Sequence, residues 1–129
     1  MSPTSYDGRM TPVILLPRFT TLLGQDRDEF LTLPIDVTAF ESARITLWRA
    51  TLQGTGVDLA STFFFDESTD RDTWTACEGT IPSQYLPANT ELVVEFGFGR
   101  KWFRLRVRLN GTDPAATCWA QGFFIRRQR

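Results

Sequence analysis

The chain has 129 residues, of which 42 % are hydrophobic and 22 % are charged. These values are ordinary for one globular domain, and a chain of this length buries about 65–70 % of its unfolded surface without help from a metal or disulfide. No run approaches the ~18 apolar residues of a membrane span. The first apolar run is short and bracketed by prolines, unlike a secretory leader. We therefore expect a protein made in the cytoplasm that does not contact a membrane.

The net charge is −1, but the charges are unevenly distributed. Residues 1–99 hold 6 basic and 14 acidic residues, whereas residues 100–129 hold 8 basic and 1 acidic residue. Such asymmetry is typical of a nucleic-acid or membrane contact, or of a subunit whose two ends attract neighbouring subunits. The near-neutral total favours the second interpretation, since nucleic-acid binders usually carry a net positive charge.

The first part of the chain predicts an arm followed by edge strands. Residues 1–11 are polar and rich in Ser, Pro and Gly, which predicts a flexible arm before a single domain over residues 12–129. Pro17 interrupts the apolar run 13–23, and Pro34 interrupts 29–37. Proline lacks an amide donor, so it is confined to edges, bends and bulges of a sheet. The run 13–23 is therefore predicted to be an edge strand or two short pieces, and the run 29–37 to lie at an edge or to bend at Pro34.

The later runs predict central strands. Residues 43–52 carry apolar side chains on both faces, and residues 102–109 alternate perfectly between an apolar and an arginine-rich face. Other apolar runs are 59–65, 74–77, 91–98 and 116–127, with a polar loop at 66–72. Eight or nine short strands with no helical period of 3.6 predict an all-β, antiparallel β-sandwich or jelly roll.

The residue types argue against catalysis. The chain has no histidine, so it lacks the usual general base and the commonest transition-metal ligand. Cys77 and Cys118 are 41 positions apart and do not form a zinc motif. They are predicted to be buried thiols rather than a disulfide. No phosphate-binding glycine loop is present. We therefore predict no cofactor, no metal site and no enzyme activity.

The acidic loop at residues 66–72 leaves one metal interpretation open. Its carboxylates at alternate positions could surround a calcium ion, but the spacing does not match a twelve-residue calcium loop. The alternative is a solvated β-turn.

An arginine row on residues 102–109 has three possible roles. Arg104, Arg106 and Arg108 stand about 7 Å apart on one strand face. The row could follow nucleic-acid phosphates with Trp102 stacked on a base. It could instead be solvated or paired with acidic residues of an adjacent strand, for which Glu91 and Glu95 are available. It could also form a subunit interface, where Arg and Trp are enriched.

From Ala43 onward, the chain resembles small jelly-roll or sandwich proteins of tailed-bacteriophage particles. The resemblance rests on a strand and polar turn leading to a tryptophan, FFFDESTDRDTW at 63–74. It also rests on FGRKWFRLRV at 98–107 and the turn LNGTDPAAT at 109–117. The N-terminal part does not match this pattern.

The resemblance implies a structural virion component, most simply a capsid decoration (cement) protein or a minor head or tail subunit. It implies a homo-oligomer, with a trimer favoured, that contacts the major capsid protein or other virion proteins. The interface residues expected for this role are Trp48, Trp74, Trp102, Arg104, Arg106 and Arg108. Nucleic acid is not the expected partner.

A carbohydrate-binding β-sandwich module without catalytic activity is the alternative function. It requires exposed aromatic rings in a row on one face to stack on pyranose rings. Trp48, Trp74 and Trp102 are the candidates for such a row.

Overall fold

The computed structural model describes residues 9–24, 29–55, 63–77 and 88–127. These residues form strands and turns and include no helix. The strands are β1 (Met10–Leu23), β2 (Glu29–Leu31), β3 (Ile35–Asp36), β4 (Phe40–Arg49), β5 (Gln53–Thr55), β6 (Phe63–Ser68), β7 (Thr75–Ala76), β8 (Leu92–Gly97), β9 (Trp102–Arg108) and β10 (Thr112–Arg126).

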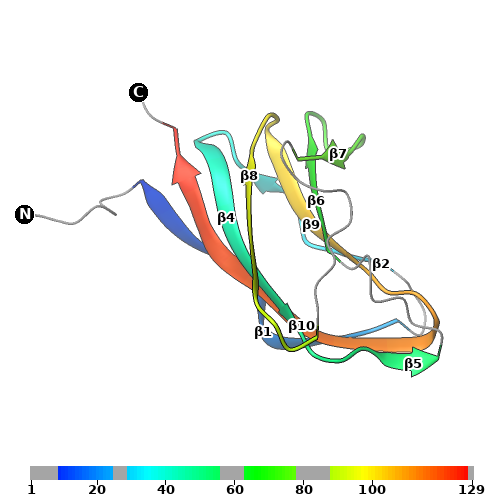
Figure 1. Cartoon of the computed structure of the whole chain (residues 1–129). Coiled ribbons are helices and arrows are strands. Elements are labelled where there is room, and N and C mark those ends of the chain that lie inside the picture. Colours follow the sequence, from blue (N-terminus) through cyan, green and yellow to red (C-terminus); the bar gives the residue numbers. More distant parts are fainter. Residues whose placement is uncertain (1–8, 25–28, 56–62, 78–87, 128–129) are drawn as a thin grey trace, which may run out of the picture.

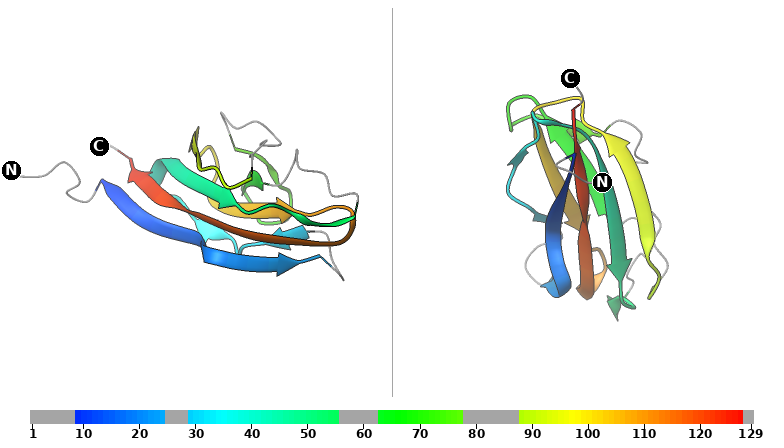
Figure 2. Two further views of the ribbon diagram at one scale, coloured as in Figure 1. Left: turned by 60° about the horizontal axis from the view of Figure 1, so that its bottom comes forward. Right: turned by 90° about the vertical axis from the view of Figure 1, so that its left-hand side faces the viewer.

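Two antiparallel sheets pack against each other, as Figures 1 and 2 show. Sheet A has the order β1-β10-β4-β8, with β5 paired to β10; sheet B has the order β2-β9-β6-β7, with β3 paired to β9. The predicted antiparallel β-sandwich is confirmed.

The strand order is that of a jelly roll. If β2–β3 and β4–β5 each count as one interrupted strand, eight strands pair first with last, second with seventh, third with sixth and fourth with fifth. The chain is therefore a long antiparallel hairpin whose two arms roll up together into two sheets. This topology brings the beginning of β1 beside the end of β10, where Met10 pairs with Ile125.

The core lies between the sheets and is built largely from phenylalanine. Phe103 is fully buried, and its ring centroid lies 5.3–6.3 Å from four other rings. These rings come from β6, β8 and its end, and β10: Phe65, Phe96, Phe98 and Phe124. Because the rings come from both sheets, they join the two layers into one core.

The perfect alternation at residues 102–109 is confirmed. Phe103, Leu105, Val107 and Leu109 are all buried, whereas the arginines between them face outward from sheet B. The predicted edge positions are also correct. β1 is an edge of sheet A, and the segment around Pro34 is not part of a strand, which divides the predicted strand into β2 and β3.

The boundaries of some elements differ from the sequence prediction. Met10 and Thr11 belong to β1, so this strand begins inside the predicted arm. Residues 1–8 of the arm lie outside the described residues, as do residues 59–62 of the strand predicted at 59–65. The predicted loop at 66–72 is wrong in its first half. Asp66, Glu67 and Ser68 are buried residues of β6. Arg104 of β9 donates a hydrogen bond to Asp66, the backbone amide of Gly99 donates to Glu67, and the Ser68 hydroxyl bonds to Asp70 in its own turn.

β1 is irregular where it crosses the middle of β10. Leu16 pairs with Ala120 and Thr20 pairs with Cys118, so three residues of β1 stand opposite the single residue Trp119. This is a β-bulge, which re-aims side chains at a sheet edge. Within it Phe19 has φ of 59°, an unusual conformation for a bulky side chain.

Candidate functional site

The outer face of sheet B carries the predicted arginine row, and the row is paired within the chain. Asp66 Oδ2 accepts hydrogen bonds from Arg104 Nε at 3.1 Å and Arg106 Nε at 3.0 Å. Glu29 Oε2 accepts bonds from Arg106 Nη1 and Arg108 Nη2, both at 3.0 Å. Three guanidinium groups thus share two carboxylates from the neighbouring strands.

Aromatic rings pack against the guanidinium groups of this row. The Arg104 guanidinium lies 4.2 Å from the ring centroid of Trp74, and that of Arg106 lies 4.2 Å from Phe64. The arginine stems and rings shield the carboxylate of Asp66, whose side chain is only 7 % exposed. Such cation–π contacts stabilise the stacked arrangement.

Trp102 is similarly covered. The guanidinium of Arg71 lies 4.7 Å and the ammonium of Lys101 lies 5.3 Å from its ring. A ring with cations over it offers less free surface for stacking on a base or a sugar. The predicted residues on sheet B therefore have partners within the chain, most of them residues that the sequence did not single out.

The sequence prediction named the wrong partners for the row. Glu95 lies in β8, which belongs to the other sheet, and it pairs with Arg44 at 3.4 Å. Glu91 precedes the same strand. The row's true partners, Asp66 and Glu29, could not be identified from the sequence because they depend on which strands flank β9. The intrachain pairing also weakens the nucleic-acid interpretation, since the side chains of Arg104 and Arg106 are only 18 % and 19 % exposed.

Hydrogen bonding sets the ionisation of two acidic groups here. The bond from Arg108 is the largest influence that lowers the pKa of Glu29. In the turn after β6, backbone amides of Thr73 and Asp72 donate to Asp70 Oδ1 and lower the pKa of Asp70. These acidic groups have partners within the chain, and the described residues contain no group of three or more potential ligands that could hold a metal ion.

The outer face of sheet A is different in character. Five large hydrophobic side chains are exposed on it: Ile14 at 67 %, Phe19 at 62 %, Leu23 at 63 %, Val93 at 48 % and Phe123 at 37 %. The register places them on the same face, because each pairs with or neighbours an outward-facing residue of β10 or β4. We call this surface the apolar face.

An aromatic cluster lies on the apolar face. Trp48 stacks on Trp119 with centroids 6.4 Å apart, and the exposed ring of Phe19 meets Trp48 edge-on at 5.5 Å. Arg18 lies 4.4 Å above the ring of Trp119, which is only 3 % exposed. The bulge of β1 places both Arg18 and Phe19 over this cluster.

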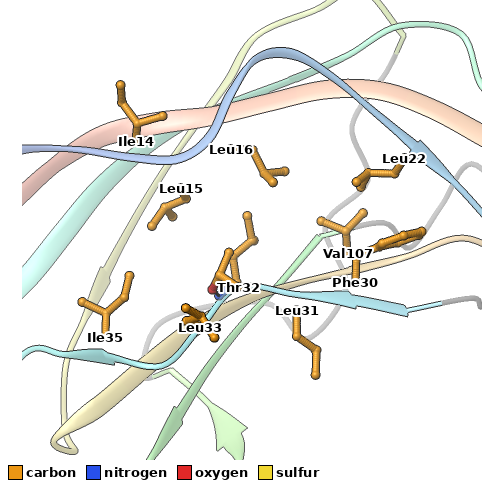
Figure 3. A pocket seen from close by; sticks show the side chains of 11 residues that line it. Ile14, Leu15, Leu16, Leu22, Phe30, Leu31, Thr32, Leu33, Ile35 and Val107 are labelled. Carbon is orange, nitrogen blue, oxygen red and sulfur yellow. Dashed lines mark hydrogen bonds between the residues drawn. The ribbon is translucent and has the colours of Figure 1, made fainter.

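A second apolar surface lies at the open edge between the sheets, where β1 faces the β2–β3 segment. It is a groove of about 490 Å³. Figure 3 shows Leu16 and Leu22 of β1 facing Phe30 and Val107, whereas Ile14 points away from them. At its rim Leu31 is 51 % and Leu33 is 85 % exposed. We call this surface the edge groove; its described lining residues carry no charge.

The predicted row of tryptophans is not formed. Trp48 faces outward from sheet A, whereas Trp74 and Trp102 lie on the sheet B side under arginine and lysine side chains. The aromatic neighbours of Trp48 are instead Phe19 and Trp119. The alternation in residues 116–127 could have placed Trp119 on the outward side of its strand, but only the pairing of β10 with β4 puts it beside Trp48. Phe19 could not have been found in this way, because the bulge breaks the alternation.

Both cysteines are free and buried, as predicted. Burial raises the pKa of Cys118 to about 12, and burial together with the nearby charges of Glu67 and Asp66 raises the pKa of Cys77 further. A thiol that stays protonated is a poor nucleophile. Neither cysteine is therefore suited to covalent chemistry at neutral pH.

No protein-family model and no curated protein matches this chain. The described residues also contain no helix that is long and apolar enough to cross a membrane.

Proposed function

We propose that this protein is a structural subunit of a bacteriophage particle that acts through protein–protein contacts, most simply as a capsid decoration protein. Its contact surface in this proposal is the apolar face of sheet A, with the edge groove beside it. Of the six interface residues expected from the sequence, Trp48 lies on this face of sheet A. The other five lie on the sheet B side.

The observation that carries the proposal is the contrast between the two outer faces. On sheet B, guanidinium groups and carboxylates pair with each other and with aromatic rings. On sheet A, five large hydrophobic side chains are exposed, and one of them, Phe19, packs against Trp48. Exposed aromatic rings that pack together are typical of a protein-binding surface, whereas single exposed hydrophobic residues are ordinary.

The proposed role suits a surface of this chemistry. A subunit that binds a particle needs a rigid scaffold and buried aromatic contact area more than it needs a pocket. The jelly roll supplies the scaffold, and the cluster of Phe19, Trp48 and Trp119 supplies the aromatic area. The paired charges of Arg44 and Glu95 at one end of the face can contribute to orientation.

The proposal is tested by locating the protein in cells that produce phage particles. An antibody raised against the purified chain is applied to fractions of a culture lysate separated on a density gradient. We expect the protein to band with particles that contain nucleic acid, and immunogold labelling to place it on their surface. Recovery only among the small soluble proteins, in cultures shown to contain intact particles, would reject the virion role.

A further inference from the structure

The turn between β9 and β10 holds a chemically reactive pair of residues, Asn110 and Gly111. Both residues are exposed, and they lie between the two strands, outside either strand ladder. Gly111 has a φ of 102°, a conformation that residues with a side chain rarely adopt. The turn lies beside β5 at one end of the sandwich (Figure 1). Water therefore reaches this turn, and the residue after Asn110 has no Cβ that could shield its amide nitrogen.

We propose that Asn110 deamidates spontaneously in the folded protein, through a cyclic imide formed with Gly111. The amide nitrogen of Gly111 loses its proton to hydroxide and attacks Cγ of Asn110. An N–Cγ bond forms, the bond from Cγ to the side-chain nitrogen breaks, and that nitrogen takes up a proton and leaves as ammonia. The attacking and attacked atoms belong to neighbouring residues, so the reaction is intramolecular, which favours it.

Water then opens the five-membered imide ring at either of its carbonyl carbons. Cleavage of the new N–Cγ bond leaves aspartate at position 110 in an ordinary backbone. Cleavage of the bond between the Gly111 nitrogen and the main-chain carbonyl carbon leaves isoaspartate, whose backbone runs through Cβ and Cγ. In sum, asparagine and water give ammonia and a carboxylate, and nothing is oxidised or reduced. Both products add a negative charge, but only isoaspartate lengthens the backbone, by one methylene carbon.

The structure on both sides of the turn has little room for a longer backbone. Leu109 is buried before the turn, and Thr112 pairs with Thr55 of β5 after it. A Cβ placed on Gly54 would lie 2.8 Å from the carbonyl oxygen of Thr112, so β5 and the start of β10 are in close contact. An added methylene carbon must displace one of these neighbours. We therefore expect the isoaspartate product to destabilise the fold and the aspartate product to leave its stability nearly unchanged.

Asn89 provides a comparison within the same chain, which contains only these two asparagines. Asn89 is also an exposed turn residue, but Thr90 follows it. The branched side chain of threonine crowds the backbone beside it and hinders attack by its amide nitrogen. Deamidation should therefore be fast at Asn110 and slow at Asn89, although both side chains are exposed.

The experiment incubates the full purified chain at physiological temperature and slightly alkaline pH, while tryptophan fluorescence verifies that it stays folded. Samples taken at intervals are digested, and their peptides are analysed by mass spectrometry. The peptide that contains Asn110 should gain about 1 Da, because a hydroxyl replaces an amino group. It should do so about ten times faster than the Asn89 peptide, or more. Equal rates at the two asparagines would overturn the proposal.

Two controls separate the sequence from the structure. Asn110→Gln keeps an amide side chain but would require a six-membered ring, so its peptide should keep its mass. The wild-type chain unfolded in urea measures the reaction of the same residues without the native turn. If Asn110 reacts in the unfolded chain but not in the folded one, the native turn blocks the attack and the proposal is wrong.

The consequence for stability is measured on the same samples. Asn110→Asp imitates the aspartate product and should unfold at the wild-type urea midpoint. Aged wild type should contain a second population that unfolds at a lower midpoint, whereas Asn110→Gln aged in parallel should not. A single transition at the wild-type midpoint, in a sample shown to contain isoaspartate at position 110, would show that the turn accepts the longer backbone and would refute the expected destabilisation. The reaction requires no partner, so its outcome is independent of the virion role.

Discussion

Replacing Asp66 with asparagine removes the charge that holds Arg104 and Arg106 while preserving the size of the side chain. The Asp66 side chain is 7 % exposed, and those of the arginines are 18 % and 19 % exposed. Removing one partner of a buried ion pair costs about 3–5 kcal/mol, because the remaining charge is left desolvated. The arginines keep some contact with water, and Arg106 keeps its bond to Glu29. We therefore expect a loss of ~3 kcal/mol from the free energy of unfolding.

The matched control is Glu95→Gln in the exposed pair with Arg44. Their atoms lie 3.4 Å apart, but the side chains are 69 % and 56 % exposed, so this substitution should cost less than about 1 kcal/mol. Unfolding in urea, followed by tryptophan fluorescence, measures both variants, and urea is uncharged and does not screen ion pairs. At a slope of ~2 kcal/mol per M, Asp66→Asn should lower the midpoint by ~1.5 M. Equal midpoints for the two variants would refute the reasoning.

Three further predictions concern the core, a backbone contact and pH. Phe103→Ala should cost about 3–5 kcal/mol in urea unfolding, because the fully buried ring is the centre of the phenylalanine cluster; a cost below ~1 kcal/mol would contradict that position. Gly122→Ala should lower thermal stability sharply, since its Cβ would collide with a backbone carbonyl of β4, whereas Gly97→Ala meets its nearest atom at 3.7 Å and should be tolerated. The bond from Arg108 lowers the pKa of Glu29, so this stabilisation is complete above the unfolded pKa near 4.5 and is lost as pH falls through the lower folded pKa. The stability difference between wild type and Glu29→Gln should therefore shrink between pH 5 and pH 2; a constant difference would contradict it.

Local sequence patterns predicted the strands well where one face is buried. The alternation at residues 102–109 identified every inward residue of β9, because a strand turns successive side chains to opposite faces. The prolines at positions 17 and 34 correctly marked irregular edge positions, since proline cannot donate to a sheet ladder.

The same patterns failed where burial comes from distant partners. The polarity of Asp66 and Glu67 suggested a solvated loop, but both are buried in β6 by hydrogen-bonding partners more than 30 positions away. A polar residue is buried when a partner satisfies it, and local sequence does not contain that partner.

The sequence by itself determined the fold class and the inward and outward residues of the regular strands, and it predicted that both cysteines are buried thiols. Only the tertiary structure decided which face is available for contact. The topology places Asp66 and Glu29 beside the arginine row, where they pair with its three guanidinium groups, and the bulge turns Phe19 onto Trp48 on sheet A. The physical reason is that side-chain periodicity is a property of one strand, whereas charge pairing and exposure depend on which strands become neighbours.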